Sequence, residues 1–327
     1  MTATMRAALI RSHGQPPGYQ DHPVPRRGTG QAVIRVTAAP VCPLDLLCAS
    51  GTSYFGKPSL PYAPGAQGVG IVEDADTLAA GQRVWFSCNA GMKPGDGAMA
   101  ELCVAEESSI LPLPGSVSDD LVAALGLSAI AAWTALTLRG GLQPGEHVLV
   151  LGASGTVGQV GVQAARLLGA GRVTAACRDA HGRARATELG ADAVADLTAD
   201  DTATLAARLA EATGGRVDLV LDPVWGMPAE AALRALSPYG RLVNLGSSAA
   251  PLAAMGSATL RSGSLSVLGY TNNALSHEQK AQALAEILRH ATAGHLTADR
   301  ETLPLAKAAE GWSRCGKPPY RRPVLIP

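Results

Sequence analysis

Short apolar runs alternate with glycine- and proline-rich turns over the first 120 residues. The stretch QPPGYQDHPVPRRGTG cannot be helical, because proline and glycine both break a helix. Runs rich in valine and isoleucine predict strands at residues 6–12, 31–37, 68–73, 83–87 and 99–104. Short strands joined by such turns are typical of a small barrel or sandwich.

The pattern changes near residue 119. The run DDLVAALGLSAIAAWTALTLRGG predicts a helix that begins at Asp119 and Asp120 and is stopped by Gly140. Apolar strands then alternate with helices, which indicates a parallel, doubly wound sheet. The expected strands are 147–151, 172–177, 192–195, 217–222, 240–245 and 264–269, and the expected helices are 156–168, 180–189, 202–213 and 227–236. A tail follows with one helix, 277–293, and one strand, 323–326.

Composition narrows the classes of partner. The formal net charge is +0 and no basic stripe is visible, which argues against nucleic acid as a partner. We find no run of about 18 apolar residues, the length that spans a bilayer. The N-terminus lacks the apolar middle of a signal peptide, so we expect a cytoplasmic protein that acts on a small molecule. The six cysteines form no C-x-x-C pair and are expected to be mostly buried, reduced thiols.

A glycine-rich turn joins the strand HVLVL to the next helix. Gly152, Gly155 and Gly158 have the spacing G-x-x-G-x-x-G between a strand and a helix. A helix N-terminus offers unpaired N–H groups and partial positive charge to a diphosphate, and glycine lets the backbone approach it closely. We therefore predict a dinucleotide site, with Ser154, Thr156 and Val157 of the same turn as further contacts.

The second strand of this unit decides between NADH and NADPH. NADH sites usually carry an acid at the end of that strand, but here it ends at Cys177 and Arg178, with Asp179 in the following turn. Arg178 and Arg183 suit a 2′-phosphate because guanidinium donates parallel hydrogen bonds. We expect NADPH; the alternative is that these arginines only form a solvated helix face.

The order of motifs is recognisable along nearly the whole chain. APVCPLDLL and SLPYAPGAQGVGIVE are followed by LGASGTVGQVGVQAARLLGA, ELGADAV, VDLVLDPVWG, GRLVNLGS and RRPVLIP. This order resembles the medium-chain dehydrogenase/reductase superfamily, within it the quinone oxidoreductases and enoyl reductases. The resemblance implies an α/β fold in which a GroES-like catalytic domain, residues 1–120 completed by 271–327, surrounds a Rossmann domain, residues 121–270.

Zinc-dependent members of this superfamily take ligands from three positions. Cys42 matches the first, but Ala66 stands at the histidine position, Gln67 replaces a glutamate and Leu127 falls near the third. Catalytic zinc needs three protein ligands, so we expect a zinc-free enzyme. The four-cysteine loop for structural zinc is also missing from the sequence.

The resemblance to the zinc-free members implies a reaction and two catalytic candidates. It implies hydride transfer to the conjugated double bond of an enone, enoyl or quinone substrate. Cys42 replaces the usual asparagine of an Asn-Pro-x-Asp segment, and Asp45 is expected to fix its loop. Tyr54 is a candidate proton donor by an imperfect match to enoyl reductases; Tyr62, Tyr270 and solvent remain alternatives.

Further contacts follow from position in the family. The strand ends Gly246, Ser247, Leu268, Gly269 and Tyr270 are expected at the cofactor, and strand 264–269 is expected to pair with its copy in a homodimer. Two other functions stay open. One is an enoyl reductase of a specific polyketide or secondary-metabolic pathway, and the other is a non-catalytic NADPH-binding sensor or crystallin-like protein.

Overall fold

The computed structural model describes residues 3–327 and divides into two compact units, which we describe separately. Unit 1 extends to Leu127 and resumes at Ala298, and unit 2 is Ser128–Thr297. The chain therefore returns to its first unit after completing the second. The expectation was that both chain ends build one unit.

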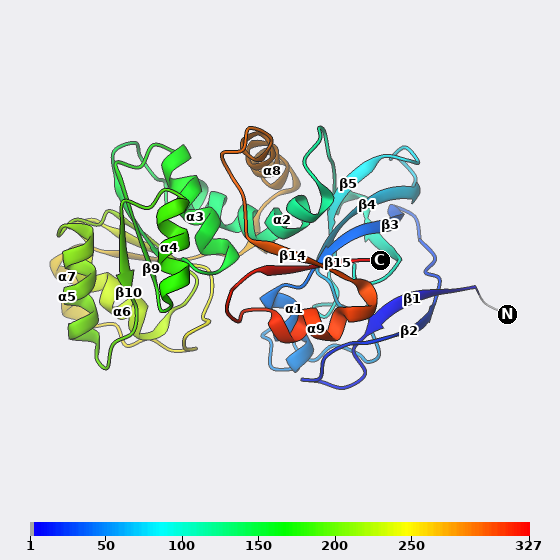
Figure 1. Ribbon diagram of the computed structural model, residues 1–327, viewed down its shortest axis with the longest axis horizontal. Coiled ribbons are helices and arrows are strands. Elements are labelled where there is room, and N and C mark those ends of the chain that lie inside the picture. Colours follow the sequence, from blue (N-terminus) through cyan, green and yellow to red (C-terminus); the bar gives the residue numbers. More distant parts are fainter. Residues whose placement is uncertain (1–2) are drawn as a thin grey trace. The chain divides into compact units, whose positions relative to one another are not determined.

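Unit 1 is a mostly antiparallel sheet structure. Its seven-stranded sheet has the order β14-β15-β3-β4-β5-β7, with β6 also paired to β3, and β1 and β2 form a separate pair. The strands are β1 (Thr4–Leu9), β2 (Gly18–Pro23), β3 (Gln31–Pro40), β4 (Gln67–Asp74), β5 (Arg83–Ser87), β6 (Leu102–Glu106), β7 (Ile110–Pro112), β14 (Arg300–Pro304) and β15 (Arg322–Ile326). The helices are α1 (Pro43–Ser50) and α9 (Ala308–Arg314). Figure 1 shows the red C-terminal β15 beside the blue β3.

Strand β3 illustrates why this sequence forms a sheet. Ile34 and Val36 are buried while Arg35 between them is exposed, which is the period-two alternation of a strand with one face on a core. Those side chains join Phe86 and Trp312 in the core of unit 1. The C-terminal tail, through Trp312, is thus part of the core of unit 1.

Unit 2 is a doubly wound sheet in which every strand pairing is parallel. Its order is β10-β9-β8-β11-β12-β13. The strands are β8 (His147–Leu151), β9 (Arg172–Cys177), β10 (Ala193–Asp196), β11 (Leu219–Asp222), β12 (Arg241–Asn244) and β13 (Ser266–Gly269). The helices that connect and follow them are α3 (Thr156–Leu167), α4 (Ala180–Glu188), α5 (Thr202–Thr213), α6 (Gly226–Ala235), α7 (Ser257–Ser262) and α8 (His277–Thr292). The expected Rossmann fold is confirmed.

Helix α2 (Asp119–Thr134) contains the boundary between the units and continues as a π-helix, Ala135–Arg139. It is kinked at Gly126, whose φ of 26° and ψ of −126° are non-helical. The stretch Asp119–Arg139 is long and apolar enough to cross a membrane by length and composition, so the expectation of no such run was wrong. Because 78% of its apolar window is buried, it is a core helix of the fold.

Most predicted elements lie within a few residues of the observed ones, but the tail was described too simply. It contains β14 and α9 as well as the predicted helix and strand. The unit boundaries also fall at 127/128 and 297/298, later than the expected 120 and 270. Helix α8 belongs to unit 2, where His290 stacks near Trp133 and Gln163 bonds the backbone of Thr297.

Candidate functional site

The glycine turn has the geometry that a diphosphate site needs. Gly152 has a φ of 63°, a left-handed conformation that favours glycine, and turns the chain at the end of β8. A Cβ on Gly158 would lie 2.4 Å from the Gly152 carbonyl oxygen, so only glycine lets α3 pack this closely on the turn. A Cβ on Gly155 would meet nothing nearer than 3.6 Å. The N-terminus of α3, at Gly155, has no side-chain cap, which leaves its amides available to an anion.

The end of β9 is tied to this turn by a side-chain contact that sequence reasoning missed. The Ser154 hydroxyl donates to the Asp179 carboxylate over 2.5 Å, and the other Asp179 oxygen caps α4 by accepting from the Gly182 amide at 2.6 Å. A Cβ on Gly182 would lie 2.3 Å from the Ser154 hydroxyl oxygen, so glycine is required there. The Asp179 carboxylate therefore has partners for both oxygens.

Two arginines follow β9 and have different surroundings. Arg178 is exposed beside the turn. Arg183 donates to the carbonyl oxygens of Cys177 and Arg178, at 3.2 and 2.8 Å, and pairs with Asp196 at 3.2 Å. Of the two predicted phosphate contacts, Arg178 is the one whose side chain faces solvent, while Arg183 braces the backbone that carries it.

The other predicted cofactor positions lie at the carboxyl ends of neighbouring strands. Gly246 and Ser247 follow β12, Leu268 and Gly269 end β13, and Tyr270 comes next. Parallel pairing places these ends at the same sheet edge as the glycine turn, where open α/β sheets bind ligands. The Tyr270 hydroxyl bonds Thr134 at 2.5 Å and Asn272 at 2.6 Å, and burial raises the pKa of Tyr270 to about 12.

Asp222 holds the turn after β11. Its carboxylate accepts from the amides of Val224 and Trp225, at 2.9 and 2.8 Å, and from the Asn244 side chain at 3.0 Å. Burial raises the pKa of Asp222. These bonds fix the chain where Trp225 has a positive φ of 60°, so Asp222 shapes the sheet edge rather than reaching into solvent.

In unit 1, Asp45 organises the loop that carries Cys42. One Asp45 oxygen accepts from the Cys42 amide at 2.7 Å and the other from the Ala66 amide at 2.9 Å. The expected role of Asp45 in fixing this loop is confirmed. The carboxyl group is 2% exposed, and burial raises its pKa to about 6.

Gln67 is the centre of a buried polar cluster that the sequence did not reveal. Its side-chain nitrogen donates to the Cys42 sulfur at 3.4 Å, and its oxygen accepts from Trp85 at 3.0 Å and from the Leu127 amide at 2.8 Å. A Cβ on Gly126 would lie 1.9 Å from that oxygen, which explains the glycine at the kink of α2. The positions that correspond to the zinc ligands of related enzymes, Cys42, Ala66 and Leu127, thus lie around the side-chain amide of Gln67.

The side chains at these positions do not fit a catalytic zinc ion. Cys42 offers one thiol, 6% exposed, whose pKa is raised by burial. Ala66 has no donor atom and Gln67 is already bonded to three groups. Among residues 3–327, no three His, Cys, Asp or Glu side chains are arranged to hold a metal ion.

The two catalytic candidates differ sharply in exposure. Cys42 is buried, whereas Tyr54 is 79% exposed and packs its ring 4.2 Å from that of Phe55. Burial of part of the ring raises the pKa of Tyr54. The alternative Tyr62 is 4% exposed, and its hydroxyl has no hydrogen-bond partner among the described residues. Of these, Tyr54 alone presents its side chain to solvent.

Comparison with known proteins agrees with this architecture. A family model described as the alcohol dehydrogenase GroES-like domain matches residues 28–115, and one described as zinc-binding dehydrogenase matches residues 156–289, a segment of unit 2. The chain belongs to the medium-chain dehydrogenase/reductase superfamily.

Individual relatives and solved structures extend the comparison. The chain is 32% identical over 311 residues to a phenolphthiocerol/phthiocerol polyketide synthase of Mycobacterium tuberculosis, covering 91% of this chain but only 14% of that polypeptide. It is 34% identical over 172 residues to the quinone oxidoreductase of Homo sapiens, half of each chain. A mycobacterial quinone oxidoreductase structure has a TM-score of 0.87 at 26% identity, covering 99% of this chain and all of that one. A mycobacterial structure in complex with NADPH gives the same values.

The glycine turn generates a prediction about folding. Gly158→Ala forces a Cβ into the Gly152 carbonyl and should destabilise the protein by about 1–3 kcal/mol, as overpacking does. Gly155→Ala is the matched control, because its Cβ points into open space and its φ of −78° suits alanine. Chemical denaturation measures both. Equal stability of the two variants would contradict the packing argument.

Asp45 generates a prediction about pH. Its carboxyl carbon resonance should titrate with a midpoint near 6, since burial disfavours the charged form. The folded pKa exceeds the ordinary 3.8, so its contribution to stability is full below about pH 4 and is lost as the pH rises through 6. Exposed Asp201, whose pKa is lowered by the Thr204 amide, is the control resonance. A midpoint at or below 3.8 for Asp45 would refute the assignment.

Proposed function

We propose that this protein is an NADPH-dependent oxidoreductase that reduces the conjugated double bond of an enone, enoyl thioester or quinone without a metal ion. The observation that carries the proposal is the uncapped N-terminus of α3 at a turn where Gly155 leaves open space. The likeness to quinone oxidoreductases, and to a structure holding NADPH, supports the choice of reaction and cofactor.

The residues of unit 2 account for cofactor binding in this proposal. The amides of Ser154, Thr156, Val157 and Gly158 face the diphosphate in this proposal. The Gly155 amide closes the turn by donating to the Gly152 carbonyl at 3.1 Å, and Gly155 leaves the space that the diphosphate occupies. When bound, NADPH supplies a hydride to the conjugated substrate. The strand ends at Gly246, Ser247, Leu268, Gly269 and Tyr270 line the nicotinamide side of the site.

In this proposal, the residues at the end of β9 discriminate between NADPH and NADH. Ser154 and the Gly182 amide each bond one oxygen of Asp179, so this carboxylate is already used to hold the turn and the start of α4 together. Exposed Arg178 then contacts the 2′-phosphate, and Arg183 orients its backbone. This division of roles favours NADPH over NADH.

Unit 1 provides the substrate side. Cys42, in its loop fixed by Asp45, presents a weak hydrogen-bond donor in place of the asparagine of related enzymes. Tyr54, with its exposed ring, is the proposed proton donor to the reduced substrate, and solvent is the alternative donor. The match to a polyketide synthase along 91% of the chain favours an enoyl reductase of a specific pathway as the second candidate function.

Two further properties complete the proposal. Strand β13 is one of the two edge strands of the six-stranded sheet, and we propose that it pairs with a second copy to form a homodimer. We also propose a cytoplasmic location, which the free state of all six cysteines supports.

Turnover tests the function directly. When the protein is mixed with NADPH and an ortho-quinone or a simple enone, the cofactor should be oxidised. The loss of its near-ultraviolet absorbance measures this oxidation. Gly155→Ala should fold normally but bind NADPH about 10-fold more weakly or worse, because its Cβ occupies the diphosphate space. Tight NADPH binding without turnover across a wide substrate panel would instead identify the non-catalytic, sensor-like alternative.

Arg178 tests the choice of cofactor. Arg178→Ala should raise the KM for NADPH by about 10- to 100-fold and leave that for NADH nearly unchanged, the loss expected for a charge-assisted bidentate contact. Arg216→Ala is the matched control, an exposed arginine before β11, at the opposite ends of the strands. A wild type that prefers NADH would rule out the NADPH assignment.

A further inference from the structure

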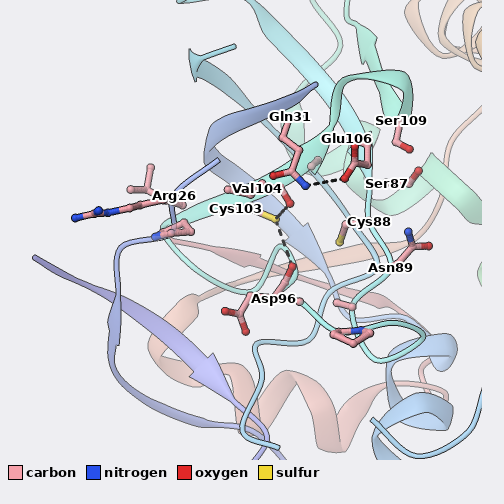
Figure 2. Close-up of a pocket in the computed structure, with 16 residues that line it drawn as sticks. Arg26, Gln31, Ser87, Cys88, Asn89, Asp96, Cys103, Val104, Glu106 and Ser109 are labelled. Carbon is pink, nitrogen blue, oxygen red and sulfur yellow. Dashed lines mark hydrogen bonds between the residues drawn. The ribbon is translucent and has the colours of Figure 1, made fainter. Parts of the chain in front are cut away.

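A pocket on unit 1 contains chemistry that the proposed reaction does not use. It encloses about 200 Å³ and is lined by residues of several segments, among them Arg26, Asn89, Asp96 and Glu106. Two cysteines, Cys88 and Cys103, also line it, and Figure 2 shows both of their side chains at this pocket. The pocket lies within unit 1, in the part of the chain where β5 leads through a loop to β6.

The two thiols are neighbours although 15 positions apart in the sequence. Cys88 directly follows β5 and is only partly buried, and Cys103 lies in β6 and is buried. Both side chains lie at the same pocket, and the Cys88 thiol is close enough to affect the pKa of the Cys103 thiol. The Cys88 sulfur also donates to the Gly65 carbonyl at 3.0 Å, and the Cys103 sulfur is 3.6 Å from the Val104 carbonyl oxygen.

The other cysteines are less suited to reaction with a solute. All six lie among the described residues, and Cys88 is the only one that is not fully buried. Cys42 and Cys315 also lie near one another, but each is only 6% exposed. A solute can therefore reach Cys88 of the first pair, whereas both thiols of the Cys42 and Cys315 pair are buried.

We propose that Cys88 and Cys103 are a modification site, an oxidisable dithiol that hydrogen peroxide converts into an intramolecular disulfide. The Cys88 sulfur, as thiolate, attacks one peroxide oxygen; the O–O bond breaks, and the product is a sulfenic acid and water after proton transfer. The Cys103 sulfur then attacks the Cys88 sulfur, the S–O bond breaks, and a second water leaves with the Cys103 proton. Two thiols are oxidised and one peroxide is reduced to two waters.

The order of these steps follows from the surroundings. The neighbouring Cys88 side chain and burial raise the pKa of the Cys103 thiol well above its ordinary value. Cys103 therefore remains a neutral, buried thiol, while the less buried Cys88 meets the oxidant at the pocket. The partner already lies beside the sulfenic acid, so disulfide formation competes with further oxidation.

Oxidation of Cys88 would also affect the segment of Gly65 and Ala66, which helps to position the Cys42 loop. The Cys88 amide donates to the Ala66 carbonyl at 2.9 Å, and its thiol donates to Gly65. The Ala66 amide in turn bonds Asp45, which holds the Cys42 amide. A disulfide removes the S–H donor to Gly65, so the modification acts on the backbone that positions this loop.

Peptide mapping tests the proposal without any activity assay, so its outcome is separate from that of the proposed function. The folded protein is treated with hydrogen peroxide, quenched in acid, denatured, alkylated and digested for mass spectrometry. The expected result is a cross-linked Cys88–Cys103 peptide lighter by two hydrogen atoms, with the other four cysteines alkylated. Reduction before alkylation should abolish it.

Three single variants sharpen the test. Cys88→Ser and Cys103→Ser should each lose the cross-link, whereas Cys48→Ser, whose thiol is buried on α1 nearby, should retain it. Circular dichroism checks that each variant is folded, and the wild-type map decides the question even where a variant is not. Sulfinic or sulfonic acid on Cys88 beside a free Cys103, a preferred Cys42–Cys315 cross-link, or no oxidation at all would each overturn the proposal.

Discussion

The close approach of helix α3 to the end of strand β8 is the constraint on which the candidate site depends. It is possible only because Gly158 has no Cβ to meet the Gly152 carbonyl, 2.4 Å from where that atom would lie. The same contact aims the first amides of α3 beyond the sheet edge, where the turn is open at Gly155. The same close contact therefore determines both the packing of α3 on β8 and the direction of the amides that would bind an anion. Any side chain at Gly158 would change both.

A second constraint acts in unit 1, through the hydrogen bonds of a buried carboxylate and a buried side-chain amide rather than through close packing. Asp45 bonds two amides, one in the Cys42 loop and one in the segment that leads into β4. Gln67 follows in that segment and connects the Cys42 sulfur to Trp85 and α2. Burying these groups is tolerable because the polar atoms have partners. An amide that fills its hydrogen bonds with protein groups gives this site a fixed shape and leaves little for a metal to bind.

The sequence predicted the elements whose patterns are local. Strand 147–151, strand 172–177 and helix 202–213 match the structure residue for residue, because a buried parallel strand is a continuous apolar run and a helix repeats at 3.6 residues. Helix α1 was missed because Pro43 opens it directly after a strand, and β2 because its polar residues GYQDHP lie at a two-stranded edge. Their formation depends on partners distant in sequence.

The same distinction applies to the site. The glycine turn could be predicted because its requirements, a left-handed φ at Gly152 and close packing at Gly158, arise within a single strand–helix unit. The contact between Ser154 and Asp179 could not, since it joins residues 25 positions apart through the pairing of β8 with β9. From the sequence, Gln67 could be recognised only as a replacement for a glutamate. In the structure its side-chain oxygen accepts a hydrogen bond from the Leu127 amide, 60 positions away.

When a residue replaces a metal ligand, the sequence shows that the ligand is missing but not which groups occupy the site. The structure identifies those groups, because it shows which residues distant in sequence lie together. At the position where zinc-dependent members of the superfamily hold the metal, this fold brings together a thiol, an amide side chain and a kinked helix.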